Sequence, residues 1–257
     1  MKLKDKVCII TGSRQGLGYE IAKEFLRNGA KVVLNGRKQE LIDQSVLELS
    51  QEFPERVIGI QADITKKAEC DKLADETVKH WGRIDILVNN ATESAIGPST
   101  EISEEGWHKT IDTNVTGSFY CSQAVATKSM LPQKSGNIIM ITSMLGIRGL
   151  QERAAYCAAK HAVIGLTKAL AVEWGKSNIR VNALCPSYVM TPLEREDVMT
   201  GRCGYTLEDI ESRMPLGRYS EPVEQAKACV FLASEDSSFI TGTTLINDGG
   251  WTIYGGW

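Results

Sequence analysis

The eight residues TGSRQGLG at positions 11–18 directly follow the apolar run Val7–Ile10 and precede a segment whose apolar residues recur with helical spacing. Glycine permits a tight turn, and the free N–H groups of a helix start can hold a pyrophosphate. A glycine-rich turn without a ligand is the alternative. A strand, a glycine loop and a helix in this order favour a phosphate-binding loop.

Outward from this loop, short apolar runs rich in β-branched residues alternate with longer segments of helical period. The runs are Val7–Ile10, Val32–Leu34, Val57–Ile60, Ile86–Val88, Ile138–Ile141, Val181–Leu184 and Thr244–Ile246. The helical segments are Gly18–Asn28, Gln39–Gln51, Ala68–Trp81, Glu104–Leu131, Ala155–Trp174 and Pro222–Ala233. This alternation predicts the α/β class: a single domain over residues 1–257 with a Rossmann-type, doubly wound parallel sheet of seven strands flanked by helices. Ligands of such sheets bind beyond the carboxyl ends of the strands.

The composition favours a small-molecule substrate over a polymeric partner. The 257 residues carry a formal net charge of −3 and no long basic block, so we expect no binding to nucleic acid or to an anionic membrane. No apolar run has the length of a membrane span, and the first residues lead straight into a strand without a signal-peptide pattern. We therefore expect a soluble protein of the cytoplasm.

Cysteine and histidine indicate neither a disulfide framework nor a metal site. The seven cysteines, including Cys203, are scattered through mostly apolar segments without paired short spacing, which is typical of reduced packing thiols. The three histidines have no second ligand type at metal-site spacing. We expect no protein-bound metal.

The glycine spacing G-x-x-x-G-x-G departs from the common dinucleotide fingerprint G-x-G-x-x-G. It resembles the short-chain dehydrogenase/reductase family, whose phosphate loop reads T-G-x-x-x-G-x-G. The resemblance extends over essentially the whole chain, through Asp63, Asn89, Asn90, Ala91, Asn114, Ser143, Tyr156, Lys160, Pro186, Thr191 and Asp248–Gly250. It implies an oxidoreductase that uses NAD(P)(H) to interconvert a ketone or aldehyde and an alcohol by hydride transfer.

The cofactor set follows from the loop and from the resemblance. An acid at the end of the second strand would hold the ribose of NAD, but this chain has Asn35, Gly36 and Arg37 there, and Arg14 lies in the loop. We therefore favour NADP(H), with NAD(H) as the alternative. The expected cofactor-binding residues are Gly12, Ser13, Arg14, Gly16, Leu17, Gly18, Arg37, Asp63, Ile64, Asn90, Tyr156, Lys160, Val189 and Thr191. The resemblance places Asp63 and Ile64 at the adenine, Asn90 at the ribose, and Val189 and Thr191 at the carboxamide.

Tyr156 and Lys160 lie four residues apart, a spacing that places both side chains on one face of a helix. A phenol has a pKa near ~10, and a neighbouring ammonium is expected to lower it toward the working range of a general acid and base. Ser143 follows the fifth predicted strand and can orient a substrate oxygen toward Tyr156. The resemblance implies Asn114 as the fourth catalytic residue, holding a water that connects Lys160 to solvent.

Two residues depart from the family pattern beside this site. Thr92 stands where the family usually has Gly after Asn-Asn-Ala, and Ser187 replaces the usual Gly after Pro186. Each adds a side chain where the backbone normally runs close to the cofactor or the sheet. The local geometry at both positions is therefore open.

Residues 187–215 are rich in charge, Gly, Pro and Met and are predicted to form a lid over the substrate. The arginines Arg148, Arg153 and Arg195 are candidates to bind an anionic substrate. Apolar side chains could instead line a pocket for an apolar alcohol or a sterol-like ketone. These are Met144, Leu145, Leu150, Tyr188, Met190 and Met199.

Two other functions are compatible with the sequence, and the resemblance also implies an oligomer. The rivals are a 3-oxoacyl thioester reductase and a non-catalytic nicotinamide-binding sensor or scaffold. The spacing from Tyr156 to Lys160 disfavours reduction of a carbon-carbon double bond, because the family members with that activity usually have a longer spacing. The resemblance also implies a homotetramer built through the segments Glu104–Leu131 and Ala155–Trp174 and through the aromatic tail Trp251–Trp257.

Overall fold

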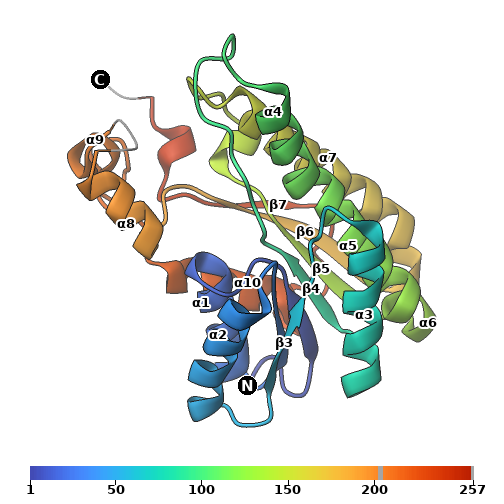
Figure 1. The fold of residues 1–257 in the computed structure, drawn as a ribbon. Helices are drawn as coiled ribbons and strands as arrows, with labels where there is room; N and C mark the ends of the chain where they lie inside the picture. Colours follow the sequence, from blue (N-terminus) through green and yellow to red (C-terminus); the bar gives the residue numbers. More distant parts are fainter. Residues whose placement is uncertain (202–204, 256–257) are drawn as a thin grey trace.

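The computed structural model describes residues 1–201 and 205–255 and contains one seven-stranded sheet (Figure 1). All strand pairs are parallel, and the strand order is β3-β2-β1-β4-β5-β6-β7. The strands are β1 (Val7–Ile10), β2 (Lys31–Gly36), β3 (Val57–Gln61), β4 (Ile86–Asn89), β5 (Gly136–Ile141), β6 (Ile179–Pro186) and β7 (Thr244–Asn247). The predicted doubly wound sheet of seven strands is confirmed.

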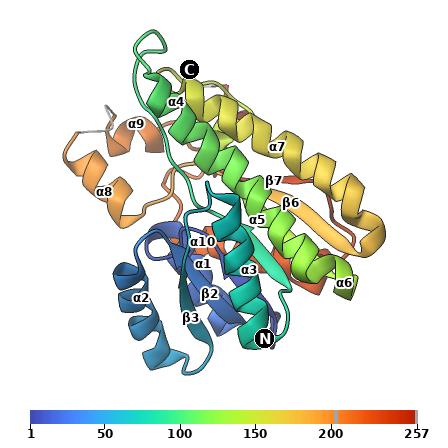
Figure 2. The same ribbon diagram turned by 45° about the vertical axis from the view of Figure 1, so that its right-hand side comes forward.

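Helices cover both faces of the sheet and bury its apolar side chains in two clusters. On one face lie α1 (Gly16–Arg27), α2 (Gln39–Glu52) and α10 (Pro222–Ala233), and α1 packs against α10. On the other face lie α3 (Lys67–Trp81), α4 (Glu104–Ile111), α5 (Gly117–Val125), α6 (Leu131–Gln133) and α7 (Ala154–Trp174). Figure 2 shows α3, α5 and α7 side by side along that face. Burial on both faces explains why most of the strands are apolar throughout instead of alternating.

The predicted helix Glu104–Leu131 contains two wider turns. The π-helical turns Asp112–Thr116 and Ala126–Met130 join α4, α5 and α6 into one continuous rod that ends at Gln133. Lys134 then adopts a left-handed conformation and stops the helix. Such turns are rare and occur frequently at functional sites. The first of them contains Asn114.

The order of strands reverses between β1 and β4, and the loops that follow these two strands cross there. Thr11 ties them together, since its hydroxyl oxygen accepts hydrogen bonds from the backbone N–H groups of Asn90 (2.9 Å) and Ala91 (3.1 Å). Gly12 has φ +63°, and a Cβ atom on it would lie 2.8 Å from Ala91 Cα. Only glycine fits this crossing, which forms the crevice where such sheets bind ligands.

The chain between β6 and α10 carries two short helices, α8 (Pro192–Met199) and α9 (Leu207–Glu211), which stand apart from the two helical layers (Figure 1). A single parallel bridge between Val189 and Ser220 connects the two ends of this excursion. Among the described residues, no helix combines the length and the apolar character required to cross a membrane.

The cysteines that the structure describes form no disulfide bonds. The six cysteines in residues 1–201 and 205–255 are free thiols, and five of them are buried. Cys203 lies outside the described residues. Within the same ranges, no group of three or more His, Cys, Asp or Glu side chains is arranged to hold a metal ion.

Candidate active site

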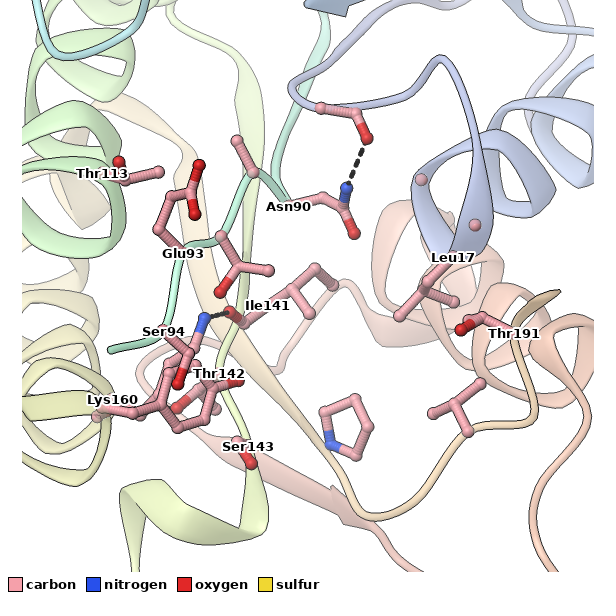
Figure 3. Close-up of a pocket in the computed structure, with 18 of the residues that line it drawn as sticks. Leu17, Asn90, Glu93, Ser94, Thr113, Ile141, Thr142, Ser143, Lys160 and Thr191 are labelled. Atoms are coloured by element: carbon pink, nitrogen blue, oxygen red, sulfur yellow. Dashed lines mark hydrogen bonds between the residues drawn. The ribbon is translucent and has the colours of Figure 1, made fainter. Parts of the chain in front are cut away.

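A pocket of about 700 Å³ opens beyond the carboxyl ends of the strands, and residues that follow β1 to β6 line it. Figure 3 shows Ser143, Lys160 and Ile141 on one wall, with Leu17 and Thr191 across from them. Of the residues expected to bind a cofactor, all but Ser13 line this pocket. The sheet thus brings together groups that lie more than a hundred positions apart in the chain.

The glycine loop leaves the start of α1 open. Gln15, the residue before the helix, makes no capping hydrogen bond with its side chain, so the first N–H groups of α1 are not capped by it. A Cβ atom on Gly18 would lie 2.4 Å from Asn90 Nδ2 and 2.7 Å from the Gly12 carbonyl oxygen. Asn90 Nδ2 in turn donates to the carbonyl oxygens of Thr11 (2.9 Å) and Gly12 (3.1 Å). These features match a cradle for a pyrophosphate.

Ser13 lies behind this loop instead of facing the pocket. It is fully buried; its hydroxyl donates to the carbonyl oxygen of Ile10 (2.7 Å) and accepts from the N–H of Asn35 (3.0 Å). The Ser13 N–H donates to the Asn35 carbonyl oxygen. Asn35 also donates to the carbonyl oxygens of Ile60 and Ala62, each at 3.2 Å. Ser13 and Asn35 therefore connect the ends of neighbouring strands.

At the end of the pocket beside β2, Arg37 pairs with a carboxylate that the sequence did not point to. The Arg37 guanidinium is 3.0 Å from Glu93 Oε1, and both residues line the pocket. Lys109 lies 3.7 Å from the same carboxylate. The side chain of Arg37 remains 64% exposed, so solvent weakens this ion pair.

Helix α7 places Tyr156 and Lys160 beside Ser143. Lys160 is buried, with 2% of its surface exposed, and its ammonium donates to the carbonyl oxygen of Ile141 at 3.0 Å (Figure 3). The Lys160 nitrogen lies 5.3 Å from the centre of the Tyr156 ring. Ser143 accepts a hydrogen bond from the N–H of Leu145 (3.2 Å). All three side chains line the same pocket.

The expected lowering of the Tyr156 pKa by Lys160 is not found. Burial raises the pKa of Tyr156, and hydrogen bonds from Thr92 and Ser143 partly oppose this rise. Burial also lowers the pKa of Lys160 to about 7, so the lysine holds a full charge only below neutral pH. Desolvation is the largest cause of both pKa shifts because both side chains are buried. The Lys160 nitrogen lies over the face of the Tyr156 ring.

Asn114 stands behind the pocket wall and does not line it. Its amide nitrogen donates to the carbonyl oxygens of Glu93 (2.7 Å) and Thr110 (2.8 Å), and its Oδ1 accepts from the Thr92 hydroxyl (2.8 Å). Thr92 itself faces the pocket. The sequence marked Thr92 as a departure from the family pattern but gave no sign of its partners. The other departure, Ser187, donates to the carbonyl oxygen of Asp248 (3.1 Å).

The outer end of the pocket combines apolar and charged side chains. Tyr188 makes edge-to-face ring contacts with Tyr205, Tyr219 and Trp251, at centroid distances of 5.1 to 5.8 Å. The lining residues here include Ile96, Met144, Leu145, Leu150, Tyr188, Glu194 and Tyr205.

The three candidate substrate arginines are separated by the structure. Arg153 lines the pocket, whereas Arg148 and Arg195 are not among its described lining residues and are exposed. Met190 packs into the aromatic cluster, and Met199 is 79% exposed. One arginine of the three therefore remains in reach of a substrate.

Comparisons with known proteins agree with this geometry. Residues 12–252 match a family model described as enoyl-(acyl carrier protein) reductase. The NAD-dependent glycerol dehydrogenase of Listeria innocua is 37% identical over 98% of this chain and 95% of its own. The 3-oxoacyl-[acyl-carrier-protein] reductase FabG of Thermotoga maritima is 36% identical over 98% of this chain and 100% of its own. The solved structure of ElxO with NADP bound has a TM-score of 0.91 at 33% identity, covering 96% of this chain and 98% of that one.

The relatives match almost end to end, and the site residues fall at the carboxyl ends of the expected strands. The chain belongs to the short-chain dehydrogenase/reductase family and is a nicotinamide-dependent oxidoreductase that interconverts alcohols and carbonyl compounds.

Proposed function

We propose that Tyr156 is the general acid and base of this reaction. The observation that carries the proposal is the shared wall on which the Tyr156 phenol, the Ser143 hydroxyl and the Lys160 ammonium meet, opposite the glycine loop. A bound nicotinamide supplies or accepts the hydride. Tyr156 donates its proton to the carbonyl oxygen during reduction and removes the hydroxyl proton during oxidation.

The other three residues support Tyr156. Ser143 donates a hydrogen bond to the substrate oxygen and holds it toward the phenol. Lys160, whose pKa near 7 allows it to gain and lose a proton at neutral pH, serves as the next group in the proton path. Asn114, whose buried amide is fixed by the carbonyl oxygens of Glu93 and Thr110, is proposed to hold the water that connects Lys160 to solvent.

NADP(H) is the proposed coenzyme. Arg37 and Arg14 both line the pocket on the side proposed for the adenosine, and the end of β2 carries Asn35, whose side chain is occupied by backbone carbonyl groups. The 2′-phosphate would replace the Glu93 carboxylate as the partner of Arg37. Asp63 and Ile64 line the region proposed for the adenine, and Val189 and Thr191 line the region proposed for the carboxamide.

The segment 187–215 is proposed to act as the lid. Thr191, Glu194 and Tyr205 from this segment line the pocket, so a movement of α8 and α9 would open or cover the substrate. The apolar side chains of this end favour a ketone or alcohol with an apolar body, and Arg153 offers one site for an anionic group.

A second candidate substrate class is a 3-oxoacyl thioester. Its support is the near-complete match to the Thermotoga maritima reductase together with the position of Arg153 at the pocket. Turnover of an acyl thioester without turnover of free ketones would select this class.

The decisive experiment follows nicotinamide absorbance with NADH and NADPH in parallel, over neutral ketones, anionic ketones, a 3-oxoacyl thioester and the matching alcohols. Tyr156→Phe is the control. We expect saturable turnover that is faster with NADPH and disappears in the control. Tight coenzyme binding without turnover of any compound would contradict the catalytic proposal and support a sensor or scaffold.

The proposed assembly is a homotetramer in the cytoplasm with no nucleic-acid or membrane partner. Its support is a set of exposed apolar side chains on the long helices and near the end of the chain, namely Trp107, Phe119, Val172, Ile253 and Tyr254. Light scattering after size-exclusion chromatography tests the tetramer, and deletion of residues 252–257 tests the tail. Cell fractionation tests the location.

A further inference from the structure

Strands β6 and β7 run side by side as far as the paired residues Pro186 and Asn247. The next residues along the two strands are Ser187 and Asp248, so the register makes them neighbours beyond the last pair. The Ser187 hydroxyl donates to the Asp248 carbonyl oxygen at 3.1 Å. A side chain therefore continues the connection between the strands where their regular pairing ends. Glycine, the family's usual residue after Pro186, has no side chain to make this bond.

The turn Asp248–Thr252, which follows β7, is held together by a buried carboxylate. Asp248 is 6% exposed, and its side chain accepts hydrogen bonds from the backbone N–H groups of Gly250 (2.9 Å) and Thr252 (2.8 Å). The Thr252 hydroxyl donates to the same carboxylate at 2.6 Å. Hydrogen bonds to an ionised acceptor are stronger than those between neutral groups, so this turn is a rigid support.

This turn supports the outer end of the pocket from behind. The Trp251 ring packs edge-to-face on Tyr188, with the ring centroids 5.1 Å apart, and Tyr188 lines the pocket. Just beyond the other end of the proposed lid 187–215, the N–H of Leu216 donates to the Gly249 carbonyl oxygen at 3.2 Å. One turn near the carboxyl end of the chain thus contacts both ends of the proposed lid.

The other ring partners of Tyr188 hold it less firmly to the sheet. Tyr205 belongs to the proposed lid itself, and Tyr219 belongs to the chain that returns from the lid to α10. These rings can shift together with Tyr188. The contacts with the turn Asp248–Thr252, in contrast, join Tyr188 to the end of β7, which the sheet holds in place.

We propose that Ser187 and Trp251 are positioning residues that fix Tyr188 at the substrate end of the pocket. This inference rests on the proposed function, which places the body of the substrate at this end. Ser187 holds the backbone next to Tyr188, and Trp251 holds its ring. Two contacts with one rigid turn define where the Tyr188 ring stands, and hence how well the pocket fits a given substrate.

The test compares Ser187→Ala, which loses the hydroxyl, with Ser187→Thr, which keeps one. Hydrogen-deuterium exchange of the protein without coenzyme or substrate measures the opening of the backbone at residues 188–192, and residues 91–98 serve as the internal reference. Steady-state kinetics with the best ketone of the panel gives KM and kcat separately. Trp251→Leu removes the ring contact and is measured in the same two ways.

We expect Ser187→Ala to speed exchange at residues 188–192 and to raise KM, each by about 5-fold, because the loss of one neutral hydrogen bond changes an equilibrium constant by about that factor. The kcat should stay within about 2-fold. Ser187→Thr should follow the unchanged protein, and Trp251→Leu should raise KM at least as much as Ser187→Ala.

Unchanged exchange in Ser187→Ala, equal changes in the Ala and Thr variants, or faster exchange with an unchanged KM would overturn the inference. If exchange becomes faster in a protein that turns over no ketone or alcohol, the support of Tyr188 stands and the proposed function fails.

Discussion

The inner wall and the outer end of the pocket are held by different forces. On the inner wall, Ser143 and Lys160 are fixed by hydrogen bonds to backbone groups of β5 and of the loop that follows it, and Asn114 behind this wall is fixed by the backbone of α4. At the outer end, Tyr188 is held by ring contacts, and at the end of the pocket beside β2, Arg37 is held by an exposed ion pair. Hydrogen bonds are directional and hold the reacting groups in one geometry. Aromatic packing and exposed ion pairs are less directional, so other side chains can replace them without changing the reaction. Changes to the inner wall should therefore affect every substrate. Changes to the outer end should affect the choice among substrates, and changes at Arg37 should affect the choice between coenzymes.

The largest effect is expected from Ser143→Ala. Loss of the hydroxyl removes a donor to the substrate oxygen and a partner of Tyr156, so kcat should fall by roughly 10²–10³-fold for all substrates. Because Ser143 and Tyr156 act on the same oxygen, Ser143→Ala/Tyr156→Phe should be little worse than Tyr156→Phe alone. Steady-state rates of the three variants measure this, and additive losses would show that the two residues act separately.

Lys160→Met should stabilise the fold in a pH-dependent way. The pKa of Lys160 is lowered from 10.5 to about 7, so between these values the unfolded chain binds a proton that the folded chain does not. The free energy of unfolding of the unchanged protein should rise across this window. At about pH 6 the variant should be more stable than the unchanged protein by roughly 3 kcal/mol. This difference should shrink as the pH rises.

Urea denaturation at about pH 6 and about pH 9 measures the change in the free energy of unfolding caused by Lys160→Met. The matched control is Lys168→Met, which changes an exposed lysine on the same helix. If both variants changed the free energy of unfolding equally at both pH values, the conclusion that burial of the Lys160 ammonium destabilises the fold would be refuted.

Tyr188→Leu should alter selectivity more than rate. The ring contacts Tyr205, Tyr219 and Trp251, and its loss loosens the outer end while the hydrogen bonds of Ser143 and Lys160 on the inner wall remain. We expect KM to change by about 10-fold for the better ketones, with a kcat change of less than about 3-fold. A uniform fall of kcat with unchanged KM would place Tyr188 on the catalytic side of the comparison.

The smallest expected effect concerns coenzyme choice. Glu93→Gln frees Arg37 from its carboxylate, and the preference for NADPH over NADH should rise by about 3-fold. Arg37→Gln should lower that preference, and salt should weaken both effects because the pair is exposed. The ratio of kcat/KM for the two coenzymes is the measurement. If neither variant changed the preference for NADPH over NADH, the pair of Arg37 and Glu93 would have no part in coenzyme recognition.

The sequence predicts the parts of the molecule that depend on local order along the chain. Glycines at positions 12, 16 and 18 after an apolar run indicated the phosphate loop, and the spacing of Tyr156 and Lys160 indicated one helix face. All seven strands follow from apolar runs bounded by turn residues. These features are local, so a single stretch of sequence contains the information.

Features that depend on contacts between distant segments were not predicted. The partnership of Thr92 with Asn114 joins residues 22 positions apart. Ser13 turned out to face Asn35, and Arg148 and Arg195 do not line the pocket. The sign of the Tyr156 pKa shift was wrong because the sequence indicated the neighbouring charge but not the burial, and burial is the larger effect.

We propose that hydride passes directly from the coenzyme to the substrate carbon at the wall formed by Ser143, Tyr156 and Lys160. The most direct test supplies coenzyme that carries deuterium at the transferable position of nicotinamide C4, together with the best ketone of the panel, and examines the alcohol by mass spectrometry. We expect one deuterium on the former carbonyl carbon and no labelled product with Tyr156→Phe. Labelled product formed equally fast by Tyr156→Phe, or alcohol without deuterium, would contradict it.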